Sequence, residues 1–358
     1  MVLTYINQSN GILARILSSP RAGQVGDLLT AADQRAISSL SHYRPKQLLI
    51  LFLLIFASCT DRPAPSSNLV RGVAALNVGT LDLLAVDFID AQTGWAVGDI
   101  DPGGVGGAIY QTLDGGWTWR PVARTNEILT TVHFVSPKTG WVAGHAGRIQ
   151  RTDDGGLTWK HQRIEHEGEV LNSIFFVDDR RGWVAGGSGL VFRTTNGGET
   201  WSQIATERVE DLWAVRFSSP ERGWIVGEDG LILSTTDGGN TWMAQASGTS
   251  RALLGVAVLP TVVIAVGEGG TILRSDGGSN WNAVESPTTA TLNAVAVTGK
   301  SLCAVGATGT ILESIDDGRS WTTLAAVSPR DLNSIEMADS THAVAVGRRG
   351  VTQLLQSQ

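Results

Sequence analysis

The chain has 358 residues, more than one hydrophobic core usually supports, so it should form several domains or one large repeat architecture. Its 12 tryptophans outnumber 8 phenylalanines and 3 tyrosines, which together with 43 glycines indicates a repeated phrase containing both residue types. Two cysteines exclude a disulfide framework, and a net charge of −7 argues against general nucleic-acid binding, which needs a dominant cationic surface.

The first predicted element is a signal peptide. Residues 48–58 (LLILFLLIFAS) are apolar and follow Arg44 and Lys46. The run is too short to span a bilayer, but its length and flanking charge are typical of the hydrophobic part of a signal peptide. Residues 1–58 are therefore predicted to be an N-terminal extension and signal peptide that takes no part in the fold.

A cysteine follows this run directly. Phe56-Ala57-Ser58-Cys59 resembles the bacterial lipobox, in which small residues precede a cysteine that becomes lipidated. We expect Cys59 to carry the lipid and residues 59–68 to form a tether containing proline and serine; signal cleavage beside an incidental cysteine is the alternative. The protein is then expected to be exported and membrane-anchored through this lipid, on a periplasmic or lumenal face.

Residues 69–358 contain one phrase seven times, an apolar residue followed by Val or Ala and then Gly. Each unit divides into four short strands, which in the third unit are residues 171–178, 182–187, 190–195 and 200–205. Four strands per repeat of roughly forty residues predict an all-β, seven-bladed β-propeller of four-stranded antiparallel blades. The glycines that end the phrase are Gly98, Gly144, Gly186, Gly227, Gly267, Gly306 and Gly347.

The seventh unit ends without a fourth strand. Its third strand is expected at residues 351–355, and no further strand follows it. Residues 69–76 supply a spare strand before the first unit. We expect this mature N-terminal strand to pair with the last blade and close the ring, because closure removes an exposed sheet edge.

A second phrase, Ser/Thr-x-Asp-x-Gly-x-Thr-Trp, lies between the third and fourth strands. It has five close matches and one departure, where Arg274 and Asn280 replace the hydroxyl residues. The short Asp or Asn side chain can bond N–H groups of its own turn, and the tryptophan can pack between blades. We expect a structural role rather than a catalytic one for the residues of this phrase, which are Asp114, Trp119, Asp154, Trp159, Asn196, Trp201, Asp237, Trp242, Asp276, Trp281, Asp316 and Trp321.

This phrase resembles the Asp-box, or bacterial neuraminidase repeat. Together with the second-strand pairs Gly94-Trp95, Gly140-Trp141, Gly182-Trp183 and Gly223-Trp224, it resembles the repeat of the photosystem II stability and assembly factors. That family consists of lumenal seven-bladed propellers that are lipoproteins in cyanobacteria, and the resemblance covers nearly all of residues 69–355. It implies a non-enzymatic exported scaffold that binds a protein partner, such as a membrane protein or its assembly intermediate.

The Asp-box also leaves open a glycan-binding or sialidase-type propeller. A sialidase needs a tyrosine nucleophile beside a carboxylate and three arginines that grip the substrate carboxylate. After Cys59 the only tyrosine is Tyr110, immediately before an Asp-box, and the sialidase Arg-Ile-Pro phrase is absent. We therefore expect no enzymatic activity and no cofactor.

Two other groups of polar residues have structural alternatives. A metal site and a solvated loop both remain open for His161, Glu165, His166, Glu167 and Glu169, since their spacing fixes no ligand geometry. A central-channel lining and local salt bridges both remain open for Asp87, His133, Arg216 and Glu336, which occupy equivalent places on the innermost strands. Cys303 is expected to be a buried core thiol.

The loops on one face of the ring are expected to carry most of the charge. In a four-stranded meander, the loops between strands two and three share a face with the connections to the next blade, and the Asp-box turns lie opposite. We expect a monomer that grips a charged partner segment with this charged rim; a solvated rim without a partner is the alternative. The predicted partner-binding residues are Arg251, Arg330, Arg348, Arg349, Glu165, Glu167, Glu210, Asp211, Glu228 and Asp229.

Overall fold

The structure is a computed structural model that describes residues 69–72, 81–100, 106–164, 168–325, 328–350 and 352–357. The predicted signal peptide, Cys59 and the tether lie outside the described residues. The described residues belong to one compact unit, Ser67–Gln358. None of the helices in this part of the chain is long and apolar enough to cross a bilayer.

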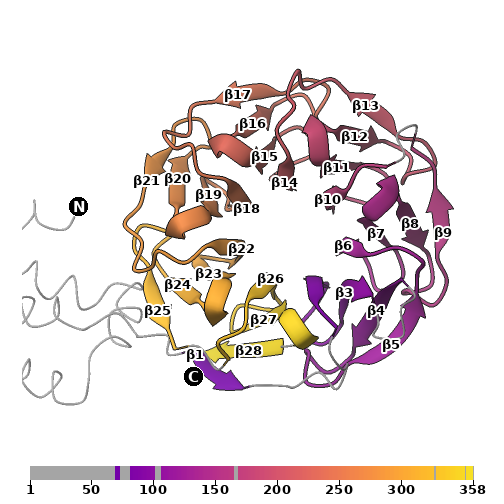
Figure 1. The fold of residues 1–358 in the computed structure, drawn as a ribbon, viewed down its shortest axis with the longest axis horizontal. Coiled ribbons are helices and arrows are strands. Elements are labelled where there is room, and N and C mark those ends of the chain that lie inside the picture. The colour runs from indigo at the N-terminus through magenta and orange to yellow at the C-terminus, as the bar shows by residue number, and fades with distance from the viewer. Residues whose placement is uncertain are drawn as a thin grey trace, which may run out of the picture. The chain divides into compact units, whose positions relative to one another are not determined.

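The described strands form seven sheets around a common axis, as Figure 1 shows. Six sheets each contain four antiparallel strands in chain order. The seventh contains the last three strands of the chain, with the first strand beside them. The predicted all-β propeller is confirmed.

The strands are numbered in chain order and are described from the axis outward. The innermost strands are β2 (Leu83–Phe88), β6 (Leu129–Phe134), β10 (Leu171–Phe176), β14 (Leu212–Phe217), β18 (Leu253–Val258), β22 (Leu292–Thr298) and β26 (Leu332–Met337). The second strands are β3 (Gly94–Ile100), β7 (Gly140–Gly144), β11 (Gly182–Gly186), β15 (Gly223–Gly227), β19 (Val262–Gly267), β23 (Ser301–Gly306) and β27 (His342–Gly347).

In the first six sheets the Asp-box turn joins the third strand to the outermost strand. The third strands are β4 (Gly107–Thr112), β8 (Ile149–Thr152), β12 (Val191–Thr194), β16 (Ile232–Thr235), β20 (Ile272–Asp276), β24 (Ile311–Ser314) and β28 (Thr352–Ser357). The outermost strands are β5 (Arg120–Arg124), β9 (Lys160–Gln162), β13 (Ser202–Ile204), β17 (Met243–Gln245), β21 (Asn282–Ala283), β25 (Thr322–Leu324) and, beside β28, β1 (Leu69–Gly72).

Short 3-10 turns join second and third strands in six of the sheets. Each contains a residue with positive φ, for example Asp229 at 52° and Arg349 at 55°, so the chain reverses within three residues. The turns are η3 (His145–Gly147), η4 (Gly187–Gly189), η5 (Glu228–Gly230), η6 (Glu268–Gly270), η7 (Ala307–Gly309) and η8 (Arg348–Gly350).

Three aromatic stacks join the first four blades to one another. Trp95 of β3 stacks on Phe134 of β6, with ring centroids 3.5 Å apart and planes 6° from parallel. The Trp95 indole also donates to the Gly155 carbonyl at 3.0 Å, in the Asp-box turn of the second blade. Trp141 and Trp183 repeat this stack, and both are almost completely buried. The repeated Gly-Trp pair therefore fastens each of these blades to the next.

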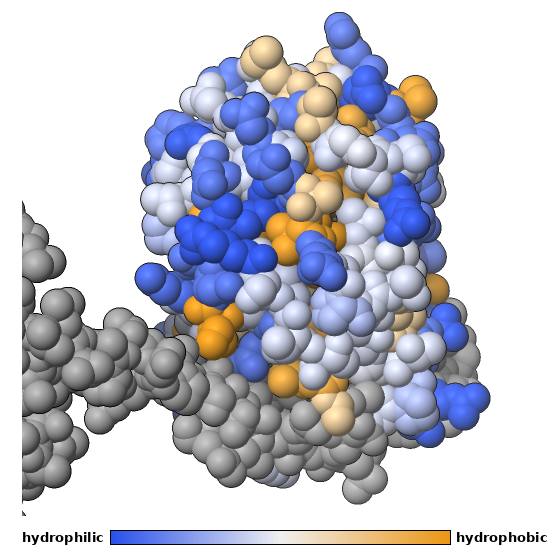
Figure 2. All heavy atoms as spheres, turned by 90° about the vertical axis from the view of Figure 1, so that its left-hand side faces the viewer, coloured by the Kyte–Doolittle hydropathy of each residue, from blue (hydrophilic) through white to orange (hydrophobic). Residues whose placement is uncertain are grey.

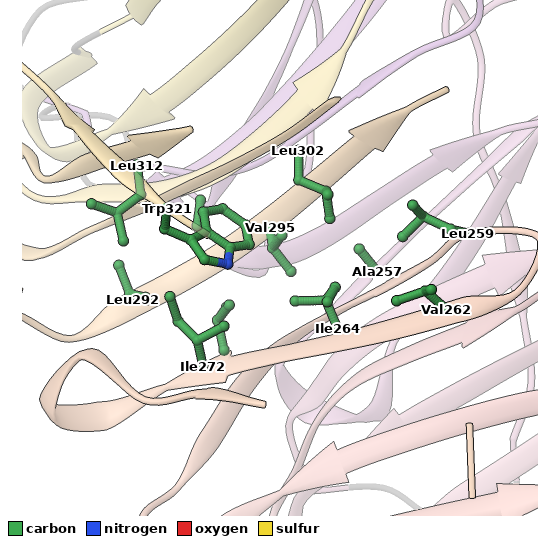
Figure 3. Packing of buried hydrophobic residues seen from close by; sticks show 12 residues of the cluster. Ala257, Leu259, Val262, Ile264, Ile272, Leu292, Val295, Leu302, Leu312 and Trp321 are labelled. Carbon is green, nitrogen blue, oxygen red and sulfur yellow. The ribbon is translucent and has the colours of Figure 1, made fainter. Parts of the chain in front are cut away.

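The later blades use aliphatic packing instead. Ile264 of β19 stands where the earlier second strands carry tryptophan, and it lies against the Asp-box glycine Gly318. Figure 3 shows Ile264, Leu292 and the box tryptophan Trp321 within one buried cluster. The loss of the Gly-Trp pair in the sequence therefore changes the side chains at the interface but keeps the sheet arrangement.

The seventh and first blades meet through the contacts that join other blades. The Asn333 amide donates to the Leu83 carbonyl at 2.8 Å, as the Asn293 amide does to the Leu332 carbonyl one blade earlier.

The outer edge of the ring is mainly hydrophilic on the side that carries β21 and β25, and its apolar residues form several small groups (Figure 2).

Candidate partner-binding surfaces

The Asp-box residues hold their own turns. In the first box, Asp114 accepts hydrogen bonds from the Thr118 N–H at 2.8 Å and from the Thr118 hydroxyl at 2.6 Å. The Thr112 hydroxyl donates to the same carboxylate at 2.8 Å and accepts from the Gly116 N–H. In the third blade the Asn196 amide oxygen accepts from the Thr194 hydroxyl and the Thr200 N–H, and its amide nitrogen donates to the Thr200 hydroxyl. Because an amide can make the same set of contacts, the box needs a short hydrogen-bonding side chain and no titratable group.

The pKa values agree with a structural role. Hydrogen bonds from the Thr158 hydroxyl and N–H lower the pKa of Asp154 to about 2, and the Thr241 bonds have the same effect on Asp237. Both carboxylates are therefore ionised at neutral pH, which does not suit a general acid. In the irregular fifth box, Asp276 instead forms an ion pair with Arg274 at 2.8 Å.

The box tryptophans lie at the edges of the aromatic stacks. Trp201 contacts Phe176 edge-on at 5.8 Å, with an interplanar angle of 85°. The ring remains half-buried, unlike Trp141, which stacks on the other side of Phe176 and is fully buried. The box tryptophans of the first five blades are therefore less buried than the second-strand tryptophans, and only Trp321 of the sixth box is buried to a similar extent.

Tyr110 is placed badly for a nucleophile. It is 7% exposed and belongs to the apolar core between the seventh and first sheets. A substrate carbon could not reach its hydroxyl without opening that core.

Several residues of the predicted charged rim are exposed on the turns and blade connectors. In the acidic part, Glu228 and Asp229 of η5 are exposed, and the Glu228 N–H donates to the Asp211 carbonyl in the connector to the fourth blade. In the basic part, Arg348 and Arg349 of η8 are exposed. The structure thus brings the turns and the blade connectors together on one rim, opposite the Asp-boxes.

Several rim charges also hold the fold. The Asp211 carboxylate accepts the Ser188 N–H at 2.8 Å, and Glu210 forms an ion pair with Arg208 at 2.7 Å. Asp211 and Glu210 are therefore only half-exposed, whereas the four arginines of the predicted set are exposed. Arg251 donates to the Gly269 carbonyl at 2.9 Å, and Arg348 lies 3.3 Å from the Asp331 carboxylate. Glu165 and Glu167 lie outside the described residues.

The four inner-strand residues are close enough to interact. The Asp87 carboxylate lies 3.4 Å from His133 Nδ1 and accepts the Phe134 N–H at 2.7 Å. Burial and the neighbouring Asp87 carboxylate raise the pKa of Glu336 to about 7, while Arg216 and His133 oppose that shift. The Asp87–His133 pair supports the local salt-bridge interpretation for those two residues.

The described residues contain no group of three or more His, Cys, Asp or Glu side chains suited to a metal ion.

The sequence analysis missed an apolar and basic surface on the Asp-box face. Among the described residues, four of the six exposed large apolar side chains occupy variable positions of the box turns: Leu113, Trp117, Leu157 and Ile315. Exposed Arg180 and Arg222 lie in turns on the same side of the ring, and Arg222 donates to the Gly277 carbonyl of the next box at 2.9 Å. The sequence signal for this surface was the apolar residue at a variable box position. A turn residue that takes no part in the box hydrogen bonds is free to point away from the core.

The fold and its turns define a β-propeller of Asp-box repeats whose box residues stabilise turns. Residues 122–210 and 207–288 match the family described as Photosynthesis system II assembly factor YCF48. The resemblance drawn from the repeat is therefore confirmed, and the matched residues include the pairs Gly140-Trp141, Gly182-Trp183 and Gly223-Trp224. A search of curated proteins gave no significant match.

Solved structures of YCF48 proteins have a similar fold. "YCF48 bound to D1 peptide" is 22% identical with a TM-score of 0.67, covering 80% of this chain and 97% of that chain. YCF48 from Cyanidioschyzon merolae is 20% identical with a TM-score of 0.65, covering 80% and 98%. A streptogramin B lyase is also similar, at 12% identity and a TM-score of 0.71, covering 83% and 100%. At these identities the likeness establishes the fold and leaves the function to the residues of each protein.

Proposed function

We propose that this protein is a non-enzymatic scaffold that binds a segment of a protein partner, in the manner of the photosystem II assembly factors. The observation that carries the proposal is the family match over residues 122–288. It is supported by the relative whose structure is described as bound to a D1 peptide. The partner class is then a membrane protein or its assembly intermediate, and the scaffold acts as a monomer.

The arginine part of the charged rim is the proposed contact surface. Arg251, Arg330, Arg348 and Arg349 are exposed on neighbouring turns and connectors of the last three blades. Their guanidinium groups suit carboxylates of an extended segment, because each can donate two parallel hydrogen bonds. The acidic part of the same rim, around Glu228 and Asp229, gives the segment a direction, since opposite charges prefer opposite ends.

The Asp-box face is the competing surface. Its exposed Leu157 and Trp117 and the exposed Arg180 could bind an amphipathic segment. The two faces differ in their expected salt dependence, because a contact dominated by charge weakens with ionic strength and an apolar contact does not.

A binding assay separates the two surfaces. A labelled synthetic D1 peptide is titrated into the wild type, into Arg348→Glu with Arg349→Glu, and into Arg180→Glu with Leu157→Asp. Saturable binding that only the rim pair weakens supports the proposal, and loss through the other pair assigns the Asp-box face. Absence of saturable binding to the wild type at low salt contradicts a D1-type partner.

Closure and anchoring belong to the same proposal. β1 lies antiparallel to β28, with Leu69 beside Ser357, and we propose that this strand completes the seventh blade. Leu69 is then at the Asp-box end of the blade, and the ten residues from Cys59 span at most about 35 Å. A lipid on Cys59 would hold the Asp-box face nearer the membrane and turn the rim away from it. Metabolic labelling with a fatty acid, lost on Cys59→Ala, tests the anchor.

The glycosidase alternative has a direct test. Burial of Tyr110 and the engagement of the box carboxylates both argue against it. We expect no release of a fluorophore from sialosides or other aryl glycosides. Hydrolysis that disappears in Tyr110→Phe would overturn the non-enzymatic assignment.

A further inference from the structure

A pocket opens on the Asp-box face where the seventh sheet meets the first. Its volume is about 350 Å³, and its lining includes Asp114 and Trp117 of the first box. The other side is formed by Asp339 and His342, from the turn between β26 and β27 and the start of β27. We call it the seam pocket.

The pocket arises where the repeat pattern breaks. In the first four blades a second-strand tryptophan reaches the next Asp-box and donates its indole N–H to a glycine carbonyl, as Trp183 does to Gly238 at 3.0 Å. In β27 the equivalent position is Val344, which has no donor. His342 lies against this box instead, so close that a Cβ on Gly115 would be 2.9 Å from its ring carbon Cε1.

His342 has an unused ring nitrogen. The residue is 6% exposed, and its Nε2 has no hydrogen-bond partner among the described residues. A buried polar atom without a partner is unfavourable, and a ligand that supplies the missing hydrogen bond removes that cost. Burial lowers the pKa of His342, and the neighbouring Asp339 opposes this shift. The imidazole is therefore neutral at neutral pH, and its Nδ1–H tautomer presents Nε2 as an acceptor.

The two carboxylates of the pocket remain ionised. Burial acts to raise the pKa of Asp339, but hydrogen bonds from the Thr341 N–H and hydroxyl outweigh it, so the pKa is lowered. The same balance, with bonds from Thr118 and Thr112, lowers the pKa of Asp114. Among the described lining residues, none is lysine or arginine. The seam pocket therefore holds negative charge and a hydrogen-bond acceptor.

The indole of Trp117 completes the arrangement. It is 48% exposed beside the pocket, and an aromatic face next to carboxylates attracts organic cations through its quadrupole. We infer that the seam pocket binds an organic ammonium group, as carried by a lysine side chain or a free alkylamine. The ammonium donates to Nε2 of His342, Asp339 and Asp114 supply the counter-charge, and Trp117 covers the alkyl chain.

The repeat provides substitutions that should preserve the fold. Trp117→Leu introduces the residue that the second box has at Leu157, and Asp339→Ser introduces the residue at the equivalent turn position Ser136. Ser136 accepts the Lys138 N–H in its own turn at 3.3 Å, so a serine can keep the turn while removing the charge. Leu157→Ala is the matched control, since it changes the same box position away from the pocket.

Isothermal titration calorimetry on the full chain tests the inference. The probes are n-butylammonium and Nα-acetyl-lysine amide, with n-butanol and the Nε-acetylated lysine amide as uncharged counterparts. We expect saturable binding of the charged probes only, weakened about tenfold by Trp117→Leu and by Asp339→Ser and unchanged by Leu157→Ala. Binding should also weaken on acidification, as His342 gains a proton beside Asp114 and Asp339.

The results decide both the chemistry and its source. Comparable affinity for the two charged probes assigns the pocket to a lysine side chain, and a strong preference for n-butylammonium assigns it to a small amine. No heat from either charged probe overturns the inference. Equal binding of n-butanol, or unchanged binding by both Trp117→Leu and Asp339→Ser, overturns it as well. Thermal unfolding of each variant checks that the ring is intact.

Discussion

Trp183 lies almost parallel to Phe217, with ring centroids 3.6 Å apart and an angle of 16° between the planes. The two residues belong to β11 and β14, so this stack joins the third blade to the fourth. Trp242 approaches the same phenylalanine edge-on at 5.8 Å. The phenylalanine is therefore held between one fully buried tryptophan and one half-buried tryptophan.

The two tryptophan classes should differ in their contribution to stability. Trp183→Ala removes a fully buried ring and should lower the free energy of unfolding by about 3–5 kcal/mol. Trp242→Ala should cost less, because its ring is partly in water and its indole nitrogen has no partner among the described residues. Chemical denaturation monitored by circular dichroism measures both, and equal losses would contradict the distinction.

The box carboxylates should make stability depend on acid. The folded-state pKa of Asp237 is about 2, against an ordinary value of 3.8. Its contribution is therefore present above pH 3.8 and is lost as the pH falls toward 2. Asp237→Asn should reduce this acid dependence, since the third box already functions with Asn196. Denaturation midpoints at several pH values test this, and an unchanged pH profile would show that Asp237 is not among the responsible groups.

The boundary between the seventh and first blades should be as strong as an ordinary blade boundary. Asn333→Ala and Asn293→Ala each leave a carbonyl of the next blade without its side-chain donor. Each should therefore destabilise the protein by a similar amount, about 1–3 kcal/mol. A negligible effect of Asn333→Ala in denaturation experiments, beside a clear effect of Asn293→Ala, would show that the ring is open at that boundary.

Cys303 should be unreactive in the folded protein. It is 1% exposed, and burial, aided by Glu313, raises the pKa of its thiol to about 12. The reactive thiolate is therefore scarce and inaccessible. In a Cys59→Ser variant, a thiol reagent should modify Cys303 only at the rate of unfolding. Rapid modification under native conditions would contradict the packing of β23.

The strands and turns that recur in every repeat could be predicted from the sequence. Contacts made by residues that differ from one repeat to the next could not. The third blade shows the success: its strands lie within the predicted segments, from Leu171 to Ile204. The hydrogen bonds of Asp114 were also predicted, because a turn phrase of fixed spacing determines local geometry. The exposed Trp117 was missed, since its box position is variable and the repeat carries no information about it.

The seam pocket could not be predicted for a different reason. Asp114 and His342 belong to opposite ends of the chain and meet only because the seventh sheet packs against the first. His342 looks like an ordinary strand residue in the sequence, and its unpartnered nitrogen is a property of packing. The difference in burial between Trp183 and Trp242 likewise depends on packing, because Trp183 stacks on the Phe217 ring and Trp242 meets it edge-on.

The forward reach of the second-strand tryptophans also bears on biosynthesis. Trp95, Trp141, Trp183 and Trp224 each donate to a carbonyl of the blade that follows in the chain. When the polypeptide emerges N-terminus first, every one of these indoles must wait for later residues before its hydrogen bond can form. A nascent chain halted after any of the first four blades would therefore display one unsatisfied indole at its growing end. Docking of the next blade supplies the missing carbonyl, so each blade that folds satisfies the indole of the blade before it.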